Sequence, residues 1–176
     1  EYRRDPNTIS DILIVDCGIG FPDEAMYGVD LVIPDINYLR DKKDKIRAIV
    51  LTHGHEDHIA ALPYILPELR VPVYGTRLTA ALAEVKLKDH GLAHHVTTVD
   101  STKRLQIGPF NVEFVHVTHS IPDAANLIIR TPVGVFYHGS DYKFDWTPMD
   151  GKQTEVGKIA KASEENILCL LSDCVR

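Results

Sequence analysis

Two continuous apolar runs in the first third of the chain are typical of buried strands. They cover residues 12–16 and 46–52 and are rich in aliphatic and β-branched side chains. The first run stops at Asp16, and the second stops just before His53. Because functional residues often follow the end of a buried strand, these two positions are the first candidates for chemistry.

The next segments alternate between the two kinds of element. Apolar side chains at helical spacing over 59–69 predict a helix, and residues 71–75 predict a strand. A second helix is predicted over 76–89, with Thr76 as its N-cap. Further elements follow after residue 103, namely strands over 111–118, 126–130 and 134–138, a helix over 155–162 and a strand over 167–171. No repeat or linker divides them, so we predict one α/β domain built on a sheet covered by helices.

Composition and charge exclude several classes of protein. Hydrophobic residues make up 44% of the chain and charged residues 25%, the balance of a folded globular domain. A formal net charge of −6 argues against attraction to nucleic acid through net charge alone. No apolar run approaches the ~20 residues that cross a bilayer, and no signal peptide is visible. Three cysteines are too few for a disulfide framework, so we expect a cytoplasmic protein with free thiols and no membrane partner.

Four potential metal ligands occur within six positions directly after the second strand. They are His53, His55, Asp57 and His58, and Gly54 allows a tight turn between the first two. Imidazole nitrogens and carboxylate oxygens suit Zn²⁺, and also Mn²⁺ or Fe. The string therefore predicts a metal site where the strand gives way to the next helix.

Two later strand ends carry further residues of the same kind. His119 and Asp141 follow apolar strands, and with the first cluster they would complete three ligands for one metal and supply a carboxylate able to bridge to a second. Asp16 is expected to orient a ligating histidine or a metal-bound water. His138 is a candidate to support Asp141 in the same way, with plain packing as the equal alternative.

In this order, the motifs resemble the metallo-β-lactamase superfamily, and within it the ribonuclease J family of β-CASP nucleases. The matching words are Phe21-Pro22, 32–35 (VIPD), 52–58 (THGHEDH), 118–123 (THSIPD) and 139–145 (GSDYKFD). The resemblance covers nearly the whole chain. It implies a four-layer αββα sandwich and a hydrolase of RNA phosphodiesters with 5′-exonuclease and endonuclease activity, which acts in RNA processing and decay. It also implies RNA as the partner and homo-oligomers of the full-length protein.

The resemblance further implies that the domain is incomplete. Residues 1–171 would form a partial metallo-β-lactamase domain that lacks its first strand and its C-terminal part, and 172–176 would begin a truncated β-CASP region. Asp173 falls at the acidic residue where that region starts. We therefore expect the 176-residue chain by itself to be inactive or weakly active.

By the same resemblance, one metal is assigned to His53, His55 and His119. The other is assigned to Asp57 and His58, with Asp141 bridging and a further histidine supplied from beyond residue 176. Two divalent ions, Zn²⁺ or else Mn²⁺, would activate a bridging hydroxide against the phosphodiester. Asp57 would orient that hydroxide, which makes Asp57 and Asp141 the candidate catalytic carboxylates.

Three other functions are compatible with parts of this pattern. The same site could hydrolyse a thioester, a lactone or a β-lactam, because a fold does not determine a substrate. A di-iron redox enzyme is disfavoured by His55, where that branch of the superfamily has Glu. A catalytically silent binding module is the alternative from outside the enzymes.

Overall fold

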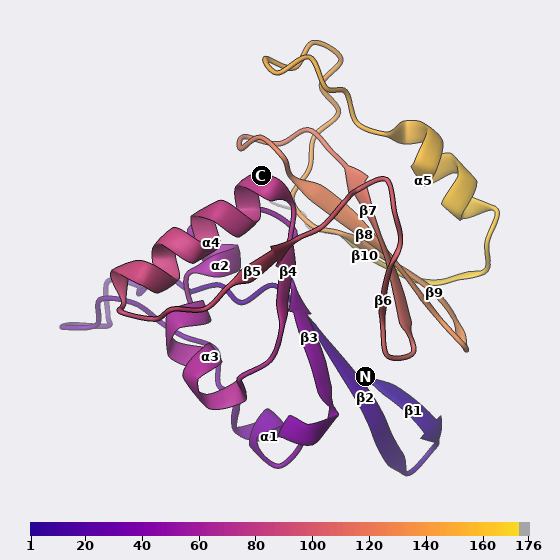
Figure 1. Cartoon of the computed structure of the whole chain (residues 1–176). Helices are drawn as coiled ribbons and strands as arrows, with labels where there is room; N and C mark the ends of the chain where they lie inside the picture. The colour runs from indigo at the N-terminus through magenta and orange to yellow at the C-terminus, as the bar shows by residue number, and fades with distance from the viewer. Residues whose placement is uncertain (173–176) are drawn as a thin grey trace.

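The structure is a computed structural model, and it describes residues 1–172. The chain forms two five-stranded sheets with helices on their outer sides (Figure 1). The first sheet has the order β1-β2-β3-β4-β5, with β1 antiparallel to β2 and the other neighbours parallel. Its strands are β1 (Tyr2–Asp5), β2 (Thr8–Val15), β3 (Ile46–Val50), β4 (Val73–Gly75) and β5 (Val96–Thr98). Because β2, β3 and β4 are parallel, their carboxyl ends lie at one edge of the sheet.

The second sheet has the order β10-β9-β8-β7-β6, and only its β9–β10 pair is parallel. Its strands are β6 (Leu105–Ile107), β7 (Phe110–His116), β8 (Ala125–Thr131), β9 (Gly134–Gly139) and β10 (Ile167–Ser172). The helices are α1 (Asn37–Arg40), α2 (Glu56–Ile59), α3 (Leu62–Leu69), α4 (Arg77–Asp89) and α5 (Val156–Ser163), with a 3₁₀ turn at Lys43–Lys45.

Three apolar cores separate four layers. The alternation along β3 shows this directly, since Ala48 and Val50 pack between the two sheets whereas Ile49 and Leu51 pack toward α3 and α4. A third core, which includes Ala162 of α5, lies on the outer face of the second sheet. Figure 1 shows α2, α3 and α4 on one outer side and α5 on the other. The αββα arrangement implied by the resemblance is therefore confirmed, whereas a single sheet, as the apolar pattern alone suggested, is wrong.

The structure also corrects several element boundaries. The helix predicted over 59–69 is divided into α2 and α3 by a break at 60–61. The short strands β1, β5 and β6 were not predicted, because three or four residues show too little alternation to be recognised. Residue 171, where the sequence places the end of the partial domain, lies in β10, and residues 173–176 lie outside the described part, so the domain division stays a prediction. Among the described residues, no helix combines the length and hydropathy needed to span a membrane.

Candidate metal centre

The histidine string that follows β3 passes close to α4 at Gly54. His53 lies in the irregular segment after β3, His55 precedes the first residue of α2, and His58 lies within α2. A Cβ atom at Gly54 would come within 2.5 Å of the Leu82 Cδ1 atom on α4. Glycine therefore lets the two flanking histidines pass close to α4 while the Leu82 side chain keeps its position.

Four side chains from both sheets converge to form what we call the buried group. His53, His55, His119 and Asp141 each place a potential ligand atom within 4.8 Å of the others. His55 Nδ1 lies 3.0 Å from His53 Nε2 and 3.2 Å from His119 Nε2. The His53 side chain is 0% exposed. His53 and His55 come from the segment after β3, and the segments after β7 and β9 bring His119 and Asp141 to them from the second sheet.

A second set, the exposed group, consists of Asp57, His58 and the same Asp141. His58 Nε2 lies 3.7 Å from Asp57 Oδ2 and 3.4 Å from Asp141 Oδ1. The Asp57 side chain is 49% exposed. The other oxygen of Asp141, Oδ2, lies 3.5 Å from His119 Nε2, so the two oxygens of one carboxylate face the two groups.

Asp16 contacts His58 on the side of the imidazole that faces away from the other members of the exposed group. Its backbone has a φ of 59°, which a short polar residue tolerates better than a branched one. Its carboxylate accepts hydrogen bonds from the Thr52 N–H (2.7 Å) and the Thr52 hydroxyl (2.8 Å), and it lies 2.8 Å from His58 Nδ1. With Nδ1 donating to Asp16, the Nε2 atom of His58 is directed toward Asp141 and Asp57.

Hydroxyl groups that the sequence reading did not single out support the same residues. Thr52 Oγ1 lies 3.1 Å from His53 Nδ1 and 2.9 Å from the Ser140 hydroxyl. Because the only hydroxyl proton of Thr52 goes to Asp16, His53 donates from Nδ1 and its Nε2 lone pair faces the buried group. A sequence signal existed, since a buried Ser or Thr directly precedes each of His53, His119 and Asp141.

The two groups differ in how their histidines hold protons. Burial, reinforced by the charges of the neighbouring histidines, lowers the pKa of His53 to about 3. Burial also lowers the pKa of His119. Burial likewise opposes the charged form of His58, but the hydrogen bond and charge of Asp16, with Asp141 and Asp57, outweigh it and raise the pKa of that imidazole. The surroundings of the buried group therefore disfavour the charged forms of His53 and His119, whereas those of the exposed group favour the charged form of His58.

The chemistry of these donors fits divalent cations. Imidazole lone pairs face one another at about hydrogen-bond distance in the buried group, with the outer nitrogen of His53 already engaged by a hydroxyl. The carboxylate of Asp141 adds negative charge between the two groups. Nitrogen and oxygen donors at this spacing are the ligands that Zn²⁺ and Mn²⁺ use.

The remaining predicted site residues lie elsewhere. His138 is on β9, and its buried Nδ1 atom has no hydrogen-bond partner among residues 1–172. It lines a cavity of about 440 Å³ with Leu13, Val15 and Phe136. Its predicted support of Asp141 is not seen as a hydrogen bond, and the role stays a prediction. Asp173 lies outside the described residues.

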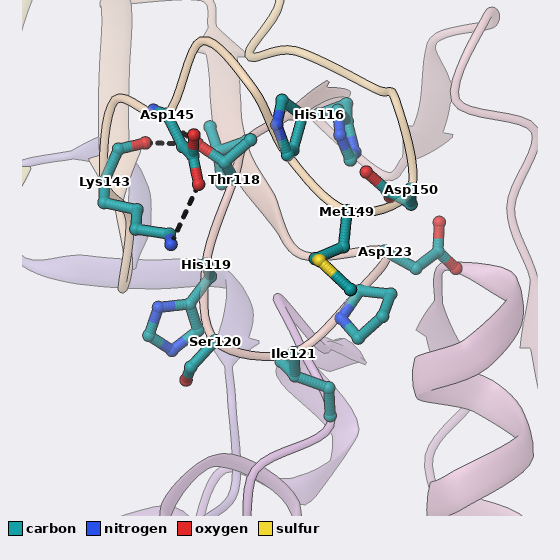
Figure 2. Close-up of a pocket in the computed structure, with 13 residues that line it drawn as sticks. His116, Thr118, His119, Ser120, Ile121, Asp123, Lys143, Asp145, Met149 and Asp150 are labelled. Atoms are coloured by element: carbon teal, nitrogen blue, oxygen red, sulfur yellow. Dashed lines mark hydrogen bonds and ion pairs between the residues drawn. The ribbon is translucent and has the colours of Figure 1, made fainter.

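A cavity of about 240 Å³ opens beside the buried group. One wall is the loop from Thr118 to Asp123, and the other is formed by residues 143–150 (Figure 2). Figure 2 shows His119 and Ser120 on the first wall, with Lys143 and Asp145 across from them. Lys143 Nζ and Asp145 Oδ2 form an ion pair at 3.1 Å.

Comparison with known proteins gives matches along most of the chain. Residues 10–146 match the family model described as the metallo-beta-lactamase superfamily. The chain is 45% identical over 172 residues to a ribonuclease J of Thermus thermophilus, covering 93% of this chain and 30% of that protein. It is 44% identical over 167 residues to a ribonuclease J of Synechocystis, covering 93% and 26% respectively. The chain thus spans less than a third of the length of these relatives.

Solved structures show the same fold. A metallo-β-lactamase of Cronobacter sakazakii with a HARLDQ motif superposes with a TM-score of 0.58 at 13% identity. The match covers 94% of this chain and 70% of that one. At this identity the likeness concerns the fold alone.

Proposed function

The chain belongs to the metallo-β-lactamase superfamily, and we propose that it is the metal-binding part of a ribonuclease that hydrolyses RNA phosphodiesters. The identity of 41–45% to several proteins named ribonuclease J, over at least 93% of this chain, supports RNA as the substrate. The single observation that carries the chemistry is the arrangement of Asp141 between the buried and exposed groups.

In this proposal the chain holds two divalent cations, Zn²⁺ or Mn²⁺. His53, His55 and His119 bind one, Asp57 and His58 bind the other, and Asp141 joins the two. Such a pair of cations supplies an acidified water as the nucleophile and stabilises charge on the phosphodiester.

The protein's own residues prepare that chemistry. Asp16 keeps the His58 imidazole turned toward the centre, and Thr52 does the same for His53. Asp57 would orient the attacking water, and its half-exposed carboxylate supports this role because solvent reaches it. Burial of His53 excludes bulk water from one side of the centre, which strengthens the electrostatic interactions there.

The test uses the gene product that contains this chain. RNA labelled at a 5′-monophosphate end is incubated with it in the presence of Zn²⁺ or Mn²⁺, beside the variants His55→Ala and His94→Ala. His94 lies in the turn after α4, outside both groups, and serves as the matched histidine control. We expect labelled mononucleotide to be released by the unchanged protein and the His94 variant only.

Other products would change the conclusion in defined ways. Internal fragments from circular RNA would indicate endonuclease activity as well. If RNA stays intact while metal is bound, ribonuclease function is wrong, and thioesters, lactones and β-lactams become the substrates to try.

We also propose that the whole protein is a cytoplasmic homo-oligomer. Cys17 and Cys169 are free thiols, which supports a reducing compartment. Cell fractionation and analytical ultracentrifugation of the gene product test the two parts of this proposal separately. Recovery outside the cytoplasm, or sedimentation as a monomer at micromolar concentration, would contradict them.

A further inference from the structure

One of the candidate ligands, His119, depends on a loop rather than on a strand end for its position. This loop, which we call the His119 loop, comprises residues 117–124 between β7 and β8. Its base is closed by a hydrogen bond from the Val117 N–H to the Ala124 carbonyl at 3.0 Å. The imidazole reaches His55 Nδ1 at 3.2 Å, so a small displacement of the loop would separate the two ligands.

The first part of the His119 loop is fastened to the segment that follows Asp141. The Thr118 N–H donates to the Thr154 hydroxyl at 3.1 Å, and the Asp145 N–H donates to the Thr118 hydroxyl at 3.2 Å. These bonds hold the loop from the side of the second sheet only.

The last part of the loop is fastened to the start of α4 through a single residue. The Asp123 carboxylate accepts a hydrogen bond from the Leu78 N–H at 2.8 Å, and the Asp123 carbonyl accepts one from the Thr76 hydroxyl at 2.8 Å. Thr76 occupies the N-cap position, but its side chain does not cap its own helix. Asp123 supplies that missing acceptor from the loop, where a negative charge also suits the helix dipole.

The middle of the loop meets α4 over the histidine string. A Cβ atom at Gly54 would come within 2.5 Å of Leu82 Cδ1 on α4 and 3.4 Å of Ile121 Cδ1 on the loop. Helix, loop and string are therefore packed against one another at one point. Figure 2 shows the loop running from His119 past Ile121 to Asp123, which lies beside the start of a helix.

The backbone of Asp123 itself has an unusual, left-handed conformation. Its φ is 65°, a left-handed value that Asp and Asn accept more readily than most residues and that glycine adopts freely. If the left-handed conformation were the only requirement at this position, glycine would meet it. The carboxylate at this position adds the contact to α4.

We propose that Asp123 is a positioning residue for the buried group, which sets the place of His119 relative to His55 by anchoring the His119 loop to the N-terminus of α4. The inference rests on the proposed metal-binding function. Asp123 itself touches no candidate ligand, and it acts through the loop and the helix.

The experiment compares variants that separate the carboxylate from the backbone. Asp123→Gly preserves the left-handed conformation and removes the anchor, whereas Asp123→Asn preserves an acceptor oxygen. Asp150→Ala is the matched control, because that carboxylate lines the same cavity but, within residues 1–172, accepts a hydrogen bond only from the nearby Lys152 N–H. Zn²⁺ affinity is measured by competition with a chromophoric chelator, and the ligand geometry is followed by the visible absorption of bound Co²⁺.

We expect Asp123→Gly to weaken binding at the tighter site by about 10–100-fold and to alter the Co²⁺ spectrum. Asp123→Asn should stay within about threefold of the unchanged chain, and Asp150→Ala should be indistinguishable from it. Urea unfolding of the metal-free variants is measured in parallel. A lower unfolding free energy with unchanged metal affinity would show a merely structural role and overturn the inference.

A second variant and the unchanged chain distinguish the remaining explanations. If Asp123→Gly does not fold, Thr76→Val, which removes the hydroxyl donor to the Asp123 carbonyl, is judged by the same affinity and spectrum. If the unchanged chain binds no divalent metal, the proposed function itself is wrong. If that chain binds metal and the variants bind it equally well, only the positioning role is wrong.

Discussion

The buried and exposed groups share Asp141 but are built in different ways. The buried group collects its histidines from the segment after β3 and the loop after β7, and its innermost member, His53, is fully buried. The exposed group consists of two neighbouring residues on the four-residue helix α2, and half of the Asp57 side chain is open to solvent. Ligands fixed by packing lose little freedom when a cation binds, whereas exposed ligands must be ordered.

This difference indicates that the two groups bind cations with different affinities. In the buried group the charged forms of His53 and His119 are disfavoured, whereas a cation at the exposed group competes with the charged form of His58, which its neighbours favour. We therefore expect the first cation to bind at the buried group and the second to bind more weakly, where water and substrate have access.

The largest expected effect comes from removing His53. His53→Ala should abolish tight binding of the first Zn²⁺, with a loss well beyond the ~10–100-fold that follows loss of an outer hydrogen-bond partner. Isothermal titration with Zn²⁺ measures this. Asp57→Ala is the contrasting variant and should leave the first binding step within a few-fold of the unchanged chain. Equal losses in both variants would show that the two groups are not distinct.

A change at Gly18 should damage the exposed group through the backbone. A Cβ at this position would lie 1.5 Å from the Asp57 carbonyl oxygen, and the neighbouring Cys17 N–H donates to the His58 carbonyl at 2.7 Å. Gly18→Ala should lower the unfolding free energy in urea by about 1–3 kcal/mol because α2 must shift. Gly20→Ala is the control, since its nearest contact would be an ordinary 3.5 Å to Val32. Equal stability of both variants would contradict the close docking of α2.

A milder change at Asp16 should affect only the exposed group. Asp16→Asn tolerates the same backbone conformation but removes the charge that faces His58 Nδ1. We expect the second cation to bind about 10–100-fold more weakly, while the first binds as before. Stepwise Co²⁺ titration resolves the two steps, and Asp35→Asn in the exposed loop before α1 is the control. A loss at the first step instead would assign Asp16 to the buried group.

The smallest effect is a pH dependence that separates the groups. Because the pKa of His58 is raised, protons compete with the second cation below that pKa, and its affinity should fall about tenfold for each pH unit. The pKa of His53 is about 3, so that imidazole stays neutral and continues to bind in the same range. Metal content measured after dialysis should therefore fall from two ions to one as the pH is lowered. Simultaneous release of both ions would contradict the comparison.

Local sequence predicted much of this site for a physical reason. His53, His55, Asp57 and His58 lie within six positions, so any folded form brings them near one another. The apolar runs before Asp16 and His53 match β2 and β3, because a strand buried on both faces needs continuous hydrophobicity.

Other features could not be seen in the pattern of residues. The division of the strands into two sheets depends on which faces pack together, and short strands such as β5 carry too few residues to show it. Thr76 was expected to cap α4, yet its hydroxyl is used by Asp123, and a carboxylate from another loop provides the cap.

By itself, the sequence determined the donor chemistry, the strands that end in it and the family to which the chain belongs. These depend on residue types that are adjacent in the chain or repeat with a regular period. Only the tertiary structure decided that Asp141 faces both groups, that Asp16 braces His58, and that Asp123 holds the His119 loop on α4. Those contacts join residues that lie on different strands, helices or loops, and they form only when the whole chain packs.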